Sequence, residues 1–163
     1  MQPIVFKLNN KSHAKKVFIF WLVLIFSTLN VNSQSEKTNN LLEKDLIGEH
    51  ALTLQWIGWD FPGTVDFYYK DDAIVCVGEQ RSRENDQDLI EIRGTINIVN
   101  EKEFLFKGII VTKIDFINNG EECIREGEFT FKISGKRKYW RMQEMGNPCE
   151  DVVDYIDIYF KKE

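Results

Sequence analysis

The sequence predicts an all-β fold: an eight-stranded antiparallel up-and-down barrel with a short N-terminal helix, or, as the alternative, a two-sheet β-sandwich. Apolar and polar residues alternate with period two in eight segments from residue 49 onwards, a pattern typical of half-buried strands. The connections between these segments alternate between tight turns and longer polar loops. Residues 1–33 resemble a signal peptide in composition, which leaves a chain of one domain's length.

The first segment predicts export. Residues 1–16 contain four lysines and no acidic residue, and an unbroken apolar run follows at residues 17–26. Val31 and Ser33 fit the −3 and −1 positions of a cleavage site, so we expect cleavage after Ser33. A membrane-spanning helix needs about 20 apolar residues, so the shorter run predicts no stable membrane anchor after cleavage. The expected location is the periplasm or the extracellular medium.

Residues 34–47 are expected to form a loose N-terminus and a short helix, and residues 48–163 the barrel domain. Asn39 or Asn40 is suited to cap the helix, and Gly48 to end it. The strands are predicted at residues 49–57, 63–70, 73–79, 89–99, 103–116, 125–133, 137–144 and 152–161. The pattern is clearest at 89–99, where isoleucines alternate with polar side chains. In 103–116, the face expected to point inward carries Phe104, Phe106, Ile110, Ile114 and Phe116.

The connections predict a barrel with two different ends. Residues 71–72, 100–102 and 134–136 are tight turns, whereas 58–62, 80–88, 117–122 and 145–151 are longer. In a meander, successive turns fall at opposite ends, so all the longer loops are expected to gather at one end. This regular alternation favours the barrel over the sandwich, and any binding is expected at the long-loop end. Eight strands form a barrel whose interior is filled by side chains or holds one small ligand.

Three cysteines follow the predicted cleavage site, and an exported protein meets an oxidising compartment. Cys123 and Cys149 fall in or beside two of the longer connections, so the sequence predicts a Cys123–Cys149 disulfide. Cys76 lies in an apolar segment and is expected to be free. Because Cys76 lies near the same end of its strand, a Cys76–Cys149 bond is the alternative.

The chain resembles the lipocalin-like (calycin) barrels in its plan along residues 40–162. Those barrels have eight strands in a meander, an N-terminal helical turn at the closed end and four loops around an open mouth. In the segment Gly48-Glu49-His50, Gly48 matches the glycine of the family's Gly-x-Trp signature, and His50 stands at the position of its tryptophan. The family's Thr-Asp-Tyr signature is missing, and no helix is expected after the last strand. The resemblance implies a barrel with a ligand site at its open mouth.

Composition argues against several classes of function. Residues 34–163 carry 26 acidic and 17 basic residues, a formal charge of −9, which disfavours binding to nucleic acid or to anionic membranes. His50 is the only histidine after the predicted cleavage site, and it alternates with apolar residues as a core histidine would. The acids at 150–157 lack the spacing of a calcium loop. We therefore expect no catalytic residues, no metal site and no cofactor.

The sequence predicts an exported, non-enzymatic module that binds a small apolar or amphipathic ligand. The aromatic segment 56–63 is expected either to plug the barrel end or to form a binding lip. The predicted ligand-binding residues are Trp56, Trp59, Val65, Ile92, Ile114 and Met142. A domain that binds a protein partner through the long loops, such as a protease inhibitor or a subunit of an envelope complex, is the alternative function.

Overall fold

The eight strands form a single antiparallel sheet that closes on itself. In the computed structural model, which describes residues 42–161, each strand pairs with the next along the chain, and the last pairs with the first. The prediction of an up-and-down barrel is therefore confirmed, and the sandwich alternative is wrong. The strands are β1 (Gly48–Leu54), β2 (Gly63–Lys70), β3 (Ala73–Arg81), β4 (Leu89–Asn100), β5 (Glu103–Lys113), β6 (Cys123–Lys132), β7 (Tyr139–Met142) and β8 (Ile156–Tyr159).

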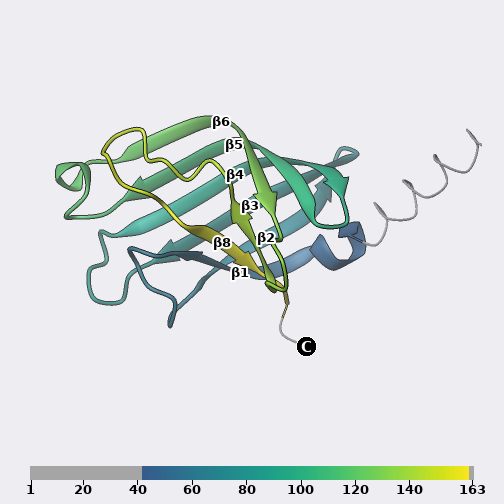
Figure 1. Ribbon diagram of the computed structural model, residues 1–163, viewed down its shortest axis with the longest axis horizontal. Coiled ribbons are helices and arrows are strands. Elements are labelled where there is room, and N and C mark those ends of the chain that lie inside the picture. Colours follow the sequence, from purple (N-terminus) through teal and green to yellow (C-terminus); the bar gives the residue numbers. More distant parts are fainter. Residues whose placement is uncertain (1–41, 162–163) are drawn as a thin grey trace, which may run out of the picture. The chain divides into compact units, whose positions relative to one another are not determined.

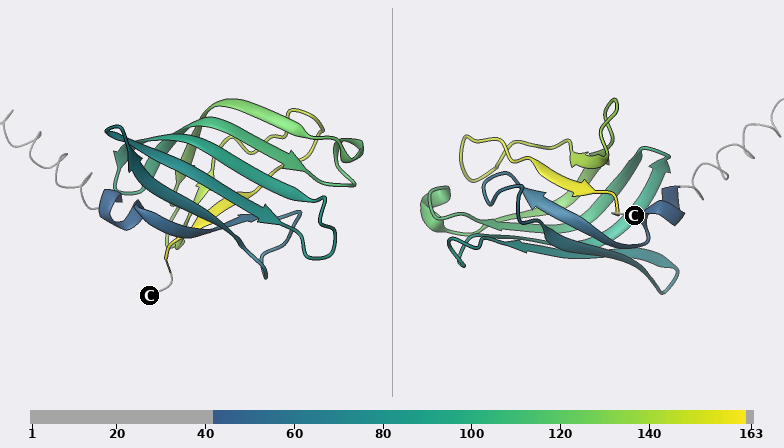
Figure 2. Two further views of the ribbon diagram at one scale, coloured as in Figure 1. Left: turned by 180° about the vertical axis from the view of Figure 1, so that it is seen from behind. Right: turned by 90° about the horizontal axis from the view of Figure 1, so that it is seen from below.

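The long and short connections lie at opposite ends, as predicted (Figure 1). One end, which we call the loop end, comprises residues 55–62, 82–88, 114–122 and 143–155, the last of which joins β7 to β8. The third of these loops contains the 3₁₀ helix η1 (Asn118–Gly120). The other end, the plain end, has the tight connections 71–72 and 101–102 together with 133–138. Figure 2 shows the helical turn at 42–46 and η1 at opposite ends of the barrel.

Several elements are shorter than predicted. Strand β1 ends at Leu54 and β5 at Lys113, whereas β7 and β8 each have only four residues. Beyond β1 and β5 the apolar and polar residues still alternate, but the chain turns into the loop end there, whereas single hydrogen bonds such as that from the Gln143 N–H to the Thr130 carbonyl continue the pairing beyond β7. The predicted helix is confirmed as the turn at 42–46. The predicted signal peptide (1–33) and the capping residues Asn39 and Asn40 lie outside the described residues.

Large side chains fill the middle of the barrel. The most completely buried include five aromatic residues, whose rings contact one another in the interior: Phe67, Phe104, Phe106, Phe131 and Trp140. Burial of this apolar surface is the main favourable contribution to the stability of the fold.

Glycines let the sheet bend tightly around this core. Gly94 on β4 pairs directly with Gly108 on β5, and the ring of Phe106 lies against both. A Cβ atom added at Gly108 would lie 2.2 Å from the carbonyl oxygen of Arg93 and 2.9 Å from the Phe106 ring. The close approach of the two backbones therefore depends on the absence of a side chain.

Candidate functional site

Buried polar contacts fix the loop end to the barrel. Asp154, which is 1% exposed, lies just before β8 and forms an ion pair with Arg125 of β6. Its carboxylate also accepts hydrogen bonds from Trp56 Nε1 at 2.8 Å and from Asn147 Nδ2 at 3.0 Å. Because Trp56 belongs to the first long loop and Asn147 to the last, one buried carboxylate joins two loops to β6.

Arg125 extends this network to the backbone of the last loop. Its guanidinium donates to the carbonyl oxygens of Glu144 at 3.3 Å and Gly146 at 3.4 Å. Burial lowers the pKa of Arg125, and the charge of Asp154 opposes that effect. An arginine remains charged in proteins, so the interaction stays an ion pair.

Gln80 holds the first loop from inside the barrel. This side chain on β3 is 1% exposed, and its Oε1 accepts a hydrogen bond from the Leu54 N–H at 2.7 Å. Its Nε2 donates to the carbonyl oxygens of Gly58 at 2.9 Å and Phe61 at 3.1 Å. A buried amide with these three partners sets the path of the loop that carries Trp59 and Phe61.

The other loops are joined in a similar way. Asp88, at the end of the second loop, accepts a hydrogen bond from the Asp115 N–H of the third loop at 2.8 Å. The Asn118 N–H of the third loop in turn donates to the carboxylate of Glu150 in the fourth. Direct contacts therefore connect all four long loops, and the loop end has a defined surface.

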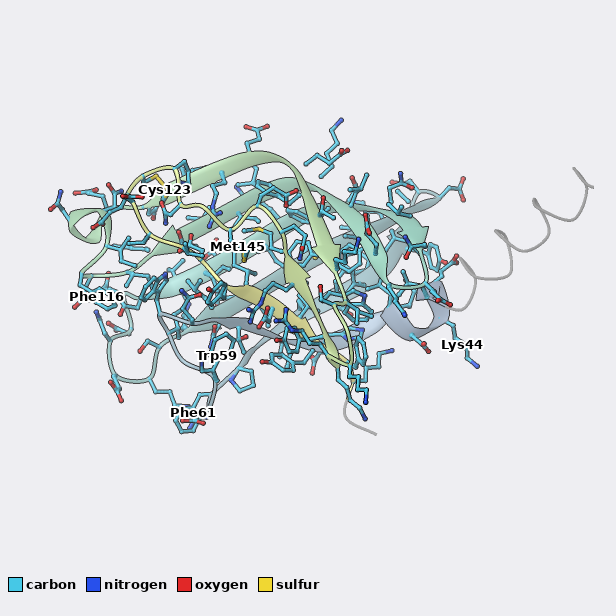
Figure 3. The ribbon with its side chains drawn as sticks, viewed as in Figure 1. Lys44, Trp59, Phe61, Phe116, Cys123 and Met145 are labelled. Atoms are coloured by element: carbon cyan, nitrogen blue, oxygen red, sulfur yellow. A yellow bond between two sulfur atoms is a disulfide. The ribbon has the colours of Figure 1, made fainter. Side chains whose placement is uncertain are left out.

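Four aromatic side chains of the long loops are exposed on this surface, and one of them, Tyr155, is 37% exposed and lies against the Arg141 guanidinium. Trp59 is 44% exposed, Phe61 53% and Phe116 63%, and Figure 3 shows them at the end of the barrel opposite Lys44. The Arg83 guanidinium lies 3.9 Å from the centre of the Phe61 ring, and Phe116 packs edge-on against Trp56 with 6.1 Å between ring centres. Exposed aromatic residues on a fixed scaffold are typical of binding surfaces.

The structure separates the six predicted ligand-binding residues into two groups. Trp56 and Trp59 lie in the loop end, where Trp56 is half-buried and Trp59 is exposed. The other four lie in the core and are at most 2% exposed: Val65, Ile92, Ile114 and Met142. A cavity large enough for water would leave part of the side chains around it accessible. Because these four are almost completely inaccessible, they are packed against other side chains of the core.

Phe116 is the residue that the strand pattern placed incorrectly. It was expected on the inward face of 103–116, but β5 ends at Lys113, and Phe116 points outward between the buried Ile114 and Ile117. The Asn118-Asn119-Gly120 segment that follows is a turn signal, and positive φ angles at all three residues place the chain reversal there. That signal could have identified Phe116 as a loop residue.

His50 is a core residue, as its alternation pattern suggested. It is 3% exposed, and its ring nitrogens lie 3.0 Å from the carbonyl oxygen of Tyr159 and 2.7 Å from that of Leu46. Burial lowers the pKa of His50, an effect that the two carbonyl contacts partly oppose. The ring joins the helical turn to β1 and β8 at the plain end.

The disulfide joins the predicted pair, Cys123 and Cys149. It links the start of β6 to the fourth loop, and the Asn147 side chain accepts a hydrogen bond from the Cys149 N–H at 2.8 Å. Cys76 is free and buried, as predicted, and burial raises the pKa of its thiol. A structural disulfide of this kind indicates a location outside the cytoplasm.

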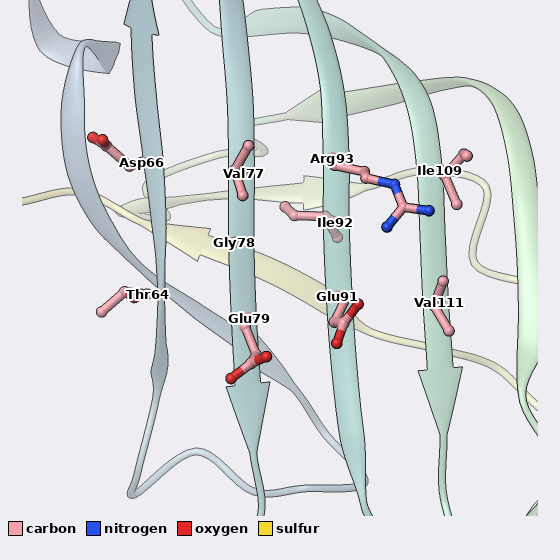
Figure 4. Close-up of a pocket in the computed structure, with 10 residues that line it drawn as sticks. All are labelled: Thr64, Asp66, Val77, Gly78, Glu79, Glu91, Ile92, Arg93, Ile109 and Val111. Atoms are coloured by element: carbon pink, nitrogen blue, oxygen red, sulfur yellow. The ribbon is translucent and has the colours of Figure 1, made fainter.

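A shallow hollow of about 380 Å³ lies on the outer face of β2 to β5 (Figure 4). Its apolar lining consists of Val77, Ile109 and Val111 together with Ile92, which is itself only 2% exposed. Two of its carboxylates, Glu79 and Glu91, already pair with Arg81. It exposes smaller side chains than the loop end does. We therefore regard the loop end as the candidate functional site.

The described part of the chain, residues 42–161, has neither a helix suited to span a membrane nor a cluster of metal-ligating side chains. No helix in this part of the chain has the length and apolar character needed to cross a membrane. Nor do three or more His, Cys, Asp or Glu side chains in it lie close enough together to hold a metal ion.

Comparison with known proteins identifies a family. The model of the PM1083 family matches residues 29–160, a span that includes all eight strands. The chain is also similar to uncharacterized protein PM1083 of Pasteurella multocida (strain Pm70), with 38% identity over 156 residues that cover 94% of this chain and 100% of that protein. No solved structure matches the chain. By both comparisons, the chain belongs to the PM1083 family.

Proposed function

We propose that this domain is an exported, non-catalytic binding module that attaches to a macromolecular partner through its loop end. The observation that carries the proposal is the group of exposed aromatic rings on interconnected loops, of which Trp59, Phe61 and Phe116 are the most exposed. A surface fixed before binding loses little conformational entropy when a partner docks. Aromatic side chains on such a surface supply a large share of binding energy.

The interior supports a surface site over an internal one. Phe67, Phe104, Phe106, Phe131 and Trp140 fill the barrel and are at most 1% exposed. A ligand inside would have to displace such side chains, whereas a partner at the loop end finds apolar area already exposed. The enclosed ring of His50, with both nitrogens beside carbonyl oxygens, supports a binding role over catalysis.

A small apolar ligand held in the barrel is the second candidate function. The closed eight-stranded meander with a helical turn at one end favours it, because lipocalin-like barrels share that plan. The ligand would enter between Trp56 and Trp59 and reach Val65, Ile92, Ile114 and Met142 after the core had rearranged.

Site-specific photo-crosslinking separates the two functions. We expect a benzoylphenylalanine at position 116, introduced into the full-length chain in the cells that produce it, to crosslink to a macromolecule. The matched control is the same substitution at Tyr69, an aromatic residue of β2 that is 54% exposed near the plain end. It should give little or no adduct, because the partner does not reach that end.

Equal adducts at both positions, or none at either, would contradict the proposal. A lack of adducts together with a rise in melting temperature on adding lipophilic compounds would instead support a ligand inside the barrel.

A further inference from the structure

The negative charge of the barrel is concentrated at the loop end. Among residues 42–161, the four long loops hold eleven acidic residues and one basic residue, Arg83, a formal charge of −10. The rest of this part of the chain has a formal charge of about +1. Nine of the eleven acids are exposed, and only Asp88 and Asp154 are buried. The exposed aromatic rings therefore lie among carboxylates.

Two cations lie at strand ends beside these loops, and the first of them is paired with carboxylates. At the end of β3, Arg81 pairs with Glu79 and Glu91. Lys113, at the end of β5, lies 3.5 Å from the side-chain oxygen of Gln87. The net field at the loop end stays negative, and it attracts a positively charged partner and repels an anionic one.

The aromatic rings suit the same kind of partner. The face of a tryptophan or phenylalanine ring attracts a lysine or arginine side chain, and the ring also offers apolar contact area. The chain contains an example of this contact, because Arg83 lies over the ring of Phe61 at 3.9 Å. Trp59 and Phe116, 44% and 63% exposed, present further ring surface to a partner.

Building on the loop-end binding proposed above, we propose that the partner presents a cationic peptide segment in which lysine or arginine alternates with apolar residues. The apolar residues contact Trp59 and Phe116, and the basic residues pair with carboxylates such as Asp60, Asp115 and Glu150. Nucleic acids and anionic lipid surfaces carry the wrong charge for this surface.

Arg83 has a defined role in this scheme. It is the one cation of the four loops, and it covers one face of Phe61. Replacing it with alanine makes the loop end more negative and frees that face. The variant R83A is therefore expected to bind a cationic peptide more tightly than the unchanged domain does.

The test uses a short fluorescent peptide that alternates lysine with leucine, and its counterpart with glutamate in place of lysine. The disulfide-bonded domain should raise the anisotropy of the lysine peptide and not that of the glutamate peptide. The affinity should fall about tenfold when the salt concentration rises from low to several times physiological. F116A should weaken binding about tenfold, and R83A should strengthen it about threefold.

Tyr69→Ala is the matched control, because it removes an equally exposed aromatic ring near the plain end. Its affinity should equal that of the unchanged domain. Equal binding of the two peptides, unchanged affinity in F116A, or preferential binding to vesicles of anionic lipid would overturn the inference.

The crosslinking at position 116 distinguishes the two possible failures. If an adduct forms there but the lysine peptide does not bind, the loop end binds a partner of other chemistry, and only the cationic assignment fails. If no adduct forms and no peptide binds, the proposed function fails as well.

Discussion

Replacing Asp154 with alanine is expected to destabilise the domain by about 3–5 kcal/mol, the usual cost of leaving a buried charge without its partner. Arg125 is 6% exposed and would lose its counterion, and Trp56 and Asn147 would lose their acceptor. The first loop would lose its contact with the buried carboxylate, whereas the fourth would keep its disulfide and its Arg125 hydrogen bonds to β6. Urea unfolding followed by tryptophan fluorescence, with the disulfide intact, measures the change.

A double variant distinguishes an uncompensated charge from a general loss of packing. In R125L/D154L, both charges of this buried pair are removed, so we expect it to be more stable than D154A. Recovery should be partial, because Trp56 and Asn147 still lack an acceptor. If the double variant is as unstable as D154A or less stable, the ion pair does not carry the effect.

The second large effect is expected at Gly108, where alanine should destabilise the barrel by about 3 kcal/mol or more. The added Cβ would meet the Arg93 carbonyl oxygen at 2.2 Å and the Gly94 Cα at 2.6 Å. Both atoms belong to the backbone of β4 and cannot move without disturbing its pairing with β5. Thermal and urea unfolding of G108A measure the loss.

Gly127 on β6 gives a matched control, because its nearest neighbour to an added Cβ is an atom of the Phe129 ring at 4.0 Å. G127A is expected to be neutral or to stabilise the barrel by about 0.4–1 kcal/mol, since alanine restricts the unfolded chain. Similar losses in G108A and G127A would show that the close backbone approach at Gly108 does not explain its effect.

The fold was predictable because its signals are local. The alternation of Ile90 and Ile92 with Glu91 and Arg93 sets both the strand and its inward face. The alternation of short and long connections then requires a meander whose long loops share one end. The disulfide followed from the same geometry, because it places Cys123 and Cys149 at that end.

The candidate site was only partly predictable, because its contacts join residues far apart in the sequence. Trp59 was predicted, but Phe116 was assigned to the core, since apolar character alone does not show where a strand stops pairing. The partner of Asp154 is Arg125, 29 positions earlier in the chain. A polar residue on an inward face, such as Gln80 or Arg125, was the one local signal of this buried network.

The sequence also left open whether side chains fill the barrel or leave a cavity inside it. Eight strands permit either a filled barrel or one that holds a ligand. The size of the interior depends on how closely neighbouring strands approach at glycines and on how rings such as Phe104 and Phe131 stack. These quantities depend on the whole barrel and cannot be obtained from any one segment.

The most direct test of a loop-end binding surface is amide hydrogen exchange of the domain, alone and with the partner captured at position 116. We predict that the partner slows exchange in residues 55–62, 82–88, 114–122 and 143–155 and leaves the plain-end turns at 71–72 and 101–102 unchanged. Slower exchange confined to the core strands or the plain end, with the long loops unaffected, would contradict the account.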